Sequence, residues 1–136
     1  MLHLDTNVMI RLLNGRNEAV RRHFDLARSR SQHLAISAVV LHELVYGACS
    51  SQREDTNLDR LSVLMAAGGV VTVPFGDPEA HAAGRLRAQL RARGTPIGPF
   101  DSLIAASALV AGATLVTANV SEFQRVEGLL LLDWSG

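Results

Sequence analysis

The segment Leu103–Ala111 is apolar almost all round, which constrains the fold more than any other part of the chain. A helix without a polar face must be buried. Pro99 suits the first turn of such a helix, and Asp101 then lies where the helix dipole favours a carboxylate. Gly112 is a plausible end, and the apolar segment Thr114–Thr117 follows directly. We therefore predict a buried helix over 99–111 that leads into a buried strand.

Strand-like and helix-like segments alternate along the rest of the chain. The strands are expected at Leu2–Leu4, Leu34–Ser37, Val70–Val73, Thr114–Thr117 and Leu129–Leu132. The other helices are expected at 8–13, 17–30, 38–48, 58–67 and 77–93, with Asn7 capping the first and a loop over 50–56. Such alternation predicts an α/β fold with a mostly parallel central sheet of four to five strands, covered on both faces. We expect one domain over 1–136, because no linker or repeat divides the chain.

Composition excludes several classes of protein. All 13 basic residues are arginine and balance 13 acidic ones, which argues against a protein that coats nucleic acid by charge. Without lysine, a receiver domain, which needs a lysine beside its acids, is also disfavoured. The single Cys49 excludes an internal disulfide and a cysteine-rich zinc site. No signal peptide or membrane-length apolar run is visible, so we expect a cytoplasmic protein without membrane contact.

Acidic residues fall where ligands bind in open α/β sheets. Asp5 ends the first strand, and parallel strands distant in sequence become neighbours at a switch point. Asp101 at a helix start, Glu43 inside an apolar helix and Glu122 after the fourth strand can reach the same crevice. Such a cluster repels itself unless a cation neutralises it, and hard oxygen ligands favour Mg²⁺ or Mn²⁺.

Each acidic residue also has a structural explanation. Asp5 can be a turn or cap residue, Asp101 a helix-start anion, and Glu122 and Asn119 solvated turn residues. Glu43 is harder to dismiss, because a charge in an apolar helix is costly unless it is paired or liganded. Taken singly these explanations stay open, whereas together the residues favour a metal site.

Four segments in order resemble the PIN domain, and specifically the VapC-type toxin ribonucleases of bacterial toxin–antitoxin pairs. They are Leu4–Asn7, Ser37–Ala48, Gly94–Asp101 with Ile104–Ala106, and Leu115–Phe123. The resemblance covers essentially the whole chain. It implies a small α/β/α sandwich and a Mg²⁺- or Mn²⁺-dependent endoribonuclease, a hydrolase that cuts RNA with a metal-activated water and leaves 5′-phosphate ends.

The same resemblance implies the site and the partners. Asp5, Glu43 and Asp101 would bind the metal, with Asn119 and Glu122 completing the catalytic set. Family toxins typically form homodimers and are inhibited by a cognate VapB antitoxin whose C-terminal segment covers the active site. Many members carry an aspartate where Asn119 stands. Either Glu122 supplies the fourth charge, as in a related subgroup with Asn and Glu at these positions, or only one metal binds.

Other functions stay open. A PIN-like domain that binds RNA or a partner without cutting it is compatible with Asn119, and a housekeeping RNA-processing nuclease is possible within the enzymes. A haloacid dehalogenase-type phosphohydrolase is disfavoured, because the chain has Asp5-Thr6-Asn7 in place of Asp-x-Asp. Two groups of arginines are either solvated helix faces or a rim that binds RNA phosphates: Arg85, Arg87, Arg91 and Arg93, and Arg11, Arg16, Arg21 and Arg22.

Overall fold

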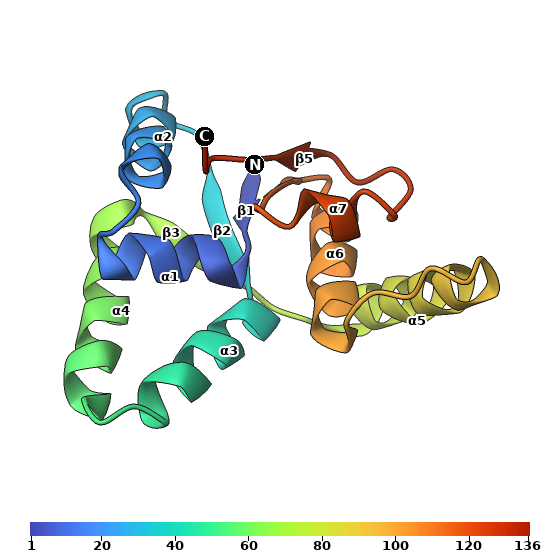
Figure 1. Cartoon of the computed structure of the whole chain (residues 1–136), viewed down its shortest axis with the longest axis horizontal. Coiled ribbons are helices and arrows are strands. Elements are labelled where there is room, and N and C mark those ends of the chain that lie inside the picture. The colour runs from blue at the N-terminus through green and yellow to red at the C-terminus, as the bar shows by residue number, and fades with distance from the viewer.

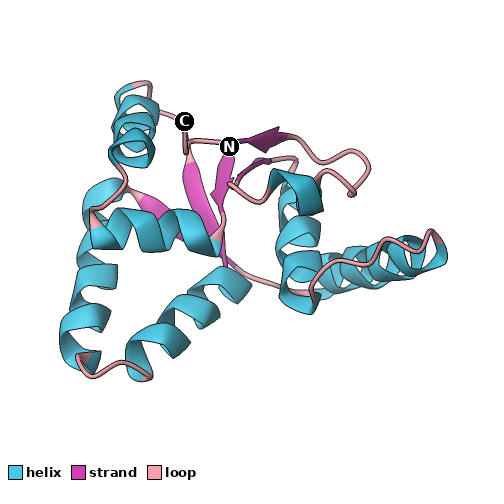
Figure 2. Cartoon of the chain, viewed as in Figure 1, coloured by secondary structure: helices cyan, strands magenta, loops and turns pink.

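A sheet of five parallel strands forms the centre of the protein in the computed structural model, which describes all residues 1–136 (Figure 2). The strands are β1 (Leu2–Leu4), β2 (Leu34–Ser37), β3 (Val70–Val73), β4 (Thr114–Val116) and β5 (Leu131–Leu132). Their order is β3-β2-β1-β4-β5, and every neighbouring pair is parallel. The predicted α/β fold with a mostly parallel sheet is therefore confirmed.

Helices cover both faces of this sheet (Figure 1). One side carries α1 (Thr6–Asn14), α2 (Glu18–Ser29), α3 (Ala38–Cys49) and α4 (Glu54–Gly68), and the other carries α5 (Asp77–Ala92), α6 (Pro99–Ala111) and the short α7 (Val120–Phe123). None of these helices combines the length and the hydropathy needed to cross a membrane.

The strand order brings β1 and β4 together although more than a hundred residues separate them. Leu4 stands opposite Val116, so the two strands end level with each other. On its other side, His3 of β1 stands opposite Ala35 of β2. The residues that follow β1 and β4 therefore meet at the carboxyl edge of the sheet, where the direction of the connections reverses.

Helix α6 is buried as its sequence predicts. The residues Ile104 to Ala108 are all nearly inaccessible, and Ile104, Ala105 and Ala108 belong to the 24-residue hydrophobic core. Gly112 ends the helix in the left-handed conformation, with φ 64°, as expected for a glycine C-cap. This rigid, buried helix fixes the position of its first turn, which carries Asp101.

Some boundaries differ from the predicted ones. Helix α4 begins at Glu54, so the expected loop over 50–56 is too long; Glu54 and Asp55 form an acidic first turn that the helix dipole stabilises. The polar segment after β4 includes the short helix α7, and β5 covers only two of the four residues expected. β5 is an edge strand and pairs with β4 alone.

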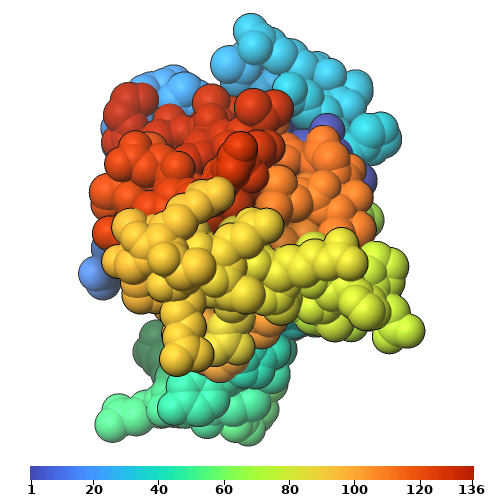
Figure 3. All heavy atoms as spheres, turned by 90° about the vertical axis from the view of Figure 1, so that its right-hand side faces the viewer, coloured from blue at the N-terminus to red at the C-terminus, as the bar shows by residue number.

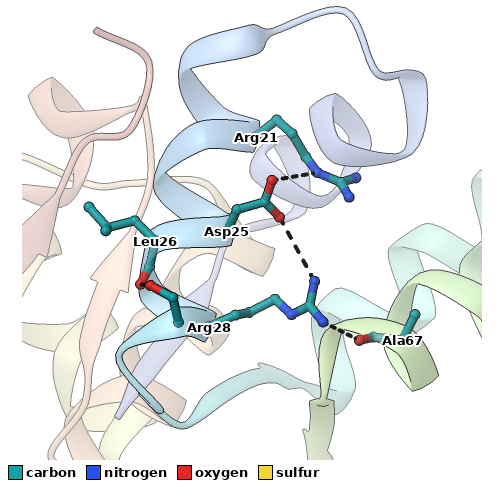
Figure 4. A network of polar contacts seen from close by, with 6 residues as sticks. Arg21, Asp25, Leu26, Arg28 and Ala67 are labelled. Carbon is teal, nitrogen blue, oxygen red and sulfur yellow. Dashed lines mark hydrogen bonds and ion pairs between the residues drawn. The ribbon is translucent and has the colours of Figure 1, made fainter.

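Helix α2 contacts the end of α4 through a polar network around Arg28 (Figure 4). The Arg28 guanidinium donates to the backbone carbonyl of Ala67 at 2.8 Å, and it also lies 3.8 Å from Asp25. The neighbouring Gly68 is buried, and a Cβ added there would lie 2.6 Å from Cζ of Phe24. The two helices can approach this closely because Gly68 has no side chain.

Candidate active site

Asp5 directly follows the carboxyl end of β1 and is 5% exposed. Its N–H donates to the Val116 carbonyl at 3.0 Å, which continues the pairing with β4. Its Oδ1 accepts from the Thr6 N–H at 2.8 Å, so Asp5 is the N-cap of α1. The prediction that Asn7 caps this helix is wrong, because the helix begins two residues earlier than expected and Asn7 already lies inside it. One oxygen of Asp5, Oδ1, therefore caps α1, and the other, Oδ2, lies toward β4 at the edge of the sheet.

Thr117 connects β4 to Asp5. Its hydroxyl donates to Asp5 Oδ2 at 2.8 Å and accepts from the Asn119 N–H at 3.0 Å, and the residue is fully buried. Burial raises the pKa of Asp5, while the hydrogen bonds from Thr117 and Thr6 act in the opposite direction. Thr117 thus orients a carboxylate that would otherwise lack a donor on that oxygen.

Glu43 reaches the same edge from α3. Its Oε1 accepts from the Thr6 hydroxyl at 2.7 Å, although 37 positions separate the two residues. Its negative charge is close enough to raise the pKa values of Asp5 and Asp101. The charge that interrupts the apolar α3 sequence is therefore turned toward the other acids.

Glu122 is held by two donors at the start of α7. The Gly98 N–H donates to Oε1 at 2.7 Å, and the Asn119 side-chain amide donates to Oε2 at 2.8 Å. These contacts, with the Gly98 bond the larger, lower the pKa of Glu122. Asn119 therefore orients a carboxylate one turn further along the chain.

Asp101 lies in the first turn of α6, beside Gly98. Burial raises its pKa to about 6, and the charges of Glu122, Asp5 and Glu43 add to this shift in that order. A Cβ at Gly98 would stand 3.3 Å from Asp101 Oδ2 and 3.7 Å from Glu122 Oε1. Glycine at this position therefore leaves room for the two carboxyl groups to face each other.

The structure thus brings together all five site residues predicted from the sequence, and it adds Thr6, Gly98 and Thr117 as residues that hold the acids. Asp5, Glu43, Asp101, Asn119 and Glu122 come from different elements and converge at the edge formed by β1 and β4. Sequence reasoning missed Thr6 and Gly98 as supporting residues. In the sequence, Thr6 is marked only by its place next to Asp5. Gly98 is marked only by its place just before the proline that opens α6.

The site has excess negative charge that no basic side chain neutralises directly. The ion pairs of the chain join Arg21 and Arg28 to Asp25, and Arg93 to Glu127, so none includes the four acids of the site. No three histidine, cysteine, aspartate or glutamate side chains are close enough to enclose an ion by themselves. Mg²⁺ keeps several waters and is usually held by one or two carboxylates, so this open set of oxygens fits a hydrated divalent cation.

Fold and site together define a class of protein: a parallel α/β domain with an acidic centre at the carboxyl edge of its sheet. The sequence matches the PIN domain over residues 2–129. It is 40% identical over 135 residues to the tRNA(fMet)-specific endonuclease VapC of Shigella flexneri, covering 97% of this chain and 96% of that protein. A second relative, Ribonuclease VapC2 of Rickettsia felis, is 33% identical over 131 residues, with 96% of each chain covered.

Solved structures give the same result. A chain of VapBC2 from Rickettsia felis, bound to a DNA fragment from their promoter, superposes with a TM-score of 0.90 at 32% identity, covering 98% of this chain and 99% of that chain. A chain of DNA-bound VapBC from Salmonella typhimurium gives a TM-score of 0.88 at 34% identity, covering 98% and 97%. The chain therefore belongs to the PIN domain family and, within it, to the VapC proteins.

Proposed function

We propose that this chain is a metal-dependent endoribonuclease and the toxin of a VapBC-type toxin–antitoxin pair. The observation that carries the proposal is the convergence of four carboxyl groups, from the end of β1 and from α3, α6 and α7, on one edge where none of them forms an ion pair. Such a cluster is unfavourable unless it binds a cation. The VapC relatives, which are named as endonucleases or ribonucleases, support hydrolysis of RNA as the reaction.

In this proposal Asp5, Glu43 and Asp101 hold Mg²⁺ or Mn²⁺. When bound, the cation supplies Lewis-acid chemistry: it lowers the pKa of water and neutralises charge on a phosphodiester. The chain's own residues hold the acids in place. Thr117 fixes Asp5, Thr6 fixes Glu43, and the first turn of α6 presents Asp101.

Glu122 fills the fourth acidic position in this proposal, and Asn119 positions it. The support is the 2.8 Å hydrogen bond from Asn119 to Glu122, together with the lowered pKa of Glu122, which keeps that carboxylate charged. Charged Glu122 can orient a water molecule or accept a proton from it. Asp101 has a raised pKa, so a bound cation would stabilise its ionised form.

The proposed partners follow from the relatives. A VapB-type antitoxin would bind this chain, because the similar chains of known structure come from VapBC complexes. We also propose a homodimer, assembled with the antitoxin into a hetero-oligomer in the cytoplasm. tRNA(fMet) is the first RNA to test, because the relative from Shigella flexneri is named for it.

The deciding experiment is cleavage of total RNA and of tRNA(fMet) by the purified chain with Mg²⁺ or Mn²⁺, beside EDTA and Asp101→Asn. Discrete cuts with 5′-phosphate ends that require both the metal and Asp101 are expected. RNA binding without any cleavage would instead favour a non-catalytic PIN-like domain. Equal cleavage by Asp101→Asn, with its fold verified by circular dichroism, would contradict the assigned site.

A further inference from the structure

A hollow of about 340 Å³ lies between α5, the start of α6 and the segment that joins them. Figure 3 looks onto this side of the molecule, where α5 and the segment after it (yellow-green to yellow) lie in front of α6 (orange). The charged residues that line the hollow are Arg87 and Arg91, and the opposite wall includes Pro96, Ile97 and Ser102. The hollow therefore has a positive wall facing a mostly apolar one.

Arg87 and Arg91 have no side-chain partner in this structure, whereas four other arginines do. Arg21, Arg28, Arg93 and Arg125 each donate a side-chain hydrogen bond to another part of the chain. Arg87 and Arg91 donate none, form no ion pair and are exposed. They stand four residues apart on α5, so both guanidinium groups extend from the same face of the helix. The hollow thus offers two cations without partners.

The hollow adjoins the acidic centre through the chain itself. Ile97 precedes Gly98, whose N–H donates to Glu122, and Ser102 follows Asp101. The buried Ser102 hydroxyl also donates to the Gly98 carbonyl at 3.2 Å. The hollow therefore lies beside the first turn of α6, which also carries Asp101.

We infer that Arg87 and Arg91 form a subsite for a backbone phosphate of the RNA substrate, next to the phosphate that is cut. This inference rests on the proposed ribonuclease function. An acidic centre repels a polyanion, and the chain has a formal net charge of +0, so attraction must come from local cations outside the centre. Guanidinium groups bind phosphate oxygens through two parallel hydrogen bonds. Such contacts set the register of RNA on the enzyme.

Matched pairs of arginines on the same helix make a sharp test. Arg87→Gln/Arg91→Gln removes two charges from the hollow. Arg85→Gln/Arg93→Gln removes two charges from α5 and from the residue that ends it, without changing the lining of the hollow, and breaks only the exposed pair of Arg93 with Glu127. Binding of a short fluorescent single-stranded RNA is measured by anisotropy in EDTA, which prevents metal-dependent cleavage, over a series of KCl concentrations.

We expect the Arg87/Arg91 pair to weaken RNA binding roughly tenfold at low salt and to reduce the slope of log K against log [KCl] by about 0.7, the value for one phosphate of a single strand. The Arg85/Arg93 pair should change both quantities much less. Equal effects of the two pairs would overturn the subsite, because only net charge would then matter.

Two further outcomes separate the possible failures. If the Arg87/Arg91 pair leaves RNA binding unchanged but weakens the complex with the antitoxin, the hollow belongs to a protein partner and the inference is wrong. If the unmodified chain binds RNA through the hollow yet never cuts it with Mg²⁺ or Mn²⁺, the subsite stands and the proposed catalytic function fails.

Discussion

At the scale of single residues, the site consists of carboxylates and the donors that hold them. Asp5 is the most buried acid, and each of its oxygens accepts one short hydrogen bond, from Thr6 and Thr117. Burying an ionised carboxylate without donors is expensive. The chain offsets part of that cost with Thr6, the first residue of α1, and Thr117, which directly follows β4.

Replacing Thr117 by valine tests this support. The substitution keeps the shape but removes the hydroxyl that donates to Asp5 Oδ2, so we expect about 1–3 kcal/mol lower free energy of unfolding. Urea denaturation measures the loss. Thr117→Ser, which keeps the hydroxyl but loses the methyl, is the control and should lose less stability. If the valine variant is as stable as the unmodified chain while the serine variant is destabilised, packing rather than the hydrogen bond is responsible.

Asp101 predicts a pH dependence of stability in the metal-free protein. Its folded pKa of about 6 lies above the ordinary 3.8, so the folded state binds this proton more tightly than the unfolded state. The stability contributed by Asp101 is therefore fully present below about pH 4 and is lost as the pH rises through about 6. A shift of this size corresponds to about 3 kcal/mol at most, and solvent screening of a partly buried group reduces it to about 1 kcal/mol.

The measurement compares unfolding of the unmodified chain and of Asp101→Asn in EDTA between pH 4 and pH 8. Because asparagine does not titrate, the variant should gain stability relative to the unmodified chain as the pH rises across this window. If the variant instead loses stability relative to the unmodified chain across this window, the folded pKa of Asp101 is lowered. That result would contradict the upward shift that burial and the neighbouring carboxylates cause.

At the scale of elements, the close approach of α4 to α2 depends on a glycine. Gly68 ends α4 against the buried ring of Phe24, which is 1% exposed and has little freedom to move. Arg28 then joins the two helices through the Ala67 carbonyl. This contact fixes the end of α4 just before β3 begins.

Gly68→Ala is therefore expected to lower the free energy of unfolding by about 1–3 kcal/mol, because the added methyl overlaps the Phe24 ring. Gly47→Ala in α3 is the matched control. A Cβ there meets nothing within 4 Å, so the higher helix propensity of alanine should add up to about 1 kcal/mol. Thermal or urea unfolding of both variants checks the opposite signs, and a stabilising Gly68→Ala would refute the packing argument.

At the scale of the whole molecule, the fold collects four acids that are far apart in the sequence into one cluster. Each comes from a different element, and the strand order places them at one edge. Their mutual repulsion is part of the free energy of the folded state. A cation that binds only the folded state should relieve it and stabilise the entire domain.

Added Mg²⁺ or Mn²⁺ is therefore expected to raise the midpoint of thermal unfolding, by an amount equivalent to about 2.7 kcal/mol at a metal concentration one hundred times Kd. Asp5→Asn should remove most of this increase, whereas Asp59→Asn, on the exposed face of α4, should keep it. Differential scanning calorimetry with and without EDTA provides the measurement, and identical shifts in both variants would argue against a metal at the acidic site.

Much of the fold follows from local sequence. β2 and β3 have the predicted bounds, and α6 runs from Pro99 to its glycine cap as expected. These elements could be predicted because apolar periodicity, β-branched residues and cap residues act over a few neighbouring positions. Strand ends and helix starts placed Asp5, Asp101, Asn119 and Glu122 near a common edge of the sheet. Glu43, inside a helix, was marked by its charge in an apolar segment, and the family resemblance completed the set.

The contacts that shape the site were decided by tertiary structure. Thr117 donates to Asp5 across 112 positions, and Gly98 donates to Glu122 across 24, so neither bond can be read from neighbouring residues. Likewise, the sequence shows several arginines on one helix but does not distinguish them. In the folded chain Arg87 and Arg91 line a hollow between α5 and α6, whereas Arg93 pairs with Glu127. Local propensity therefore determined the elements, while strand order and helix packing determined which side chains meet.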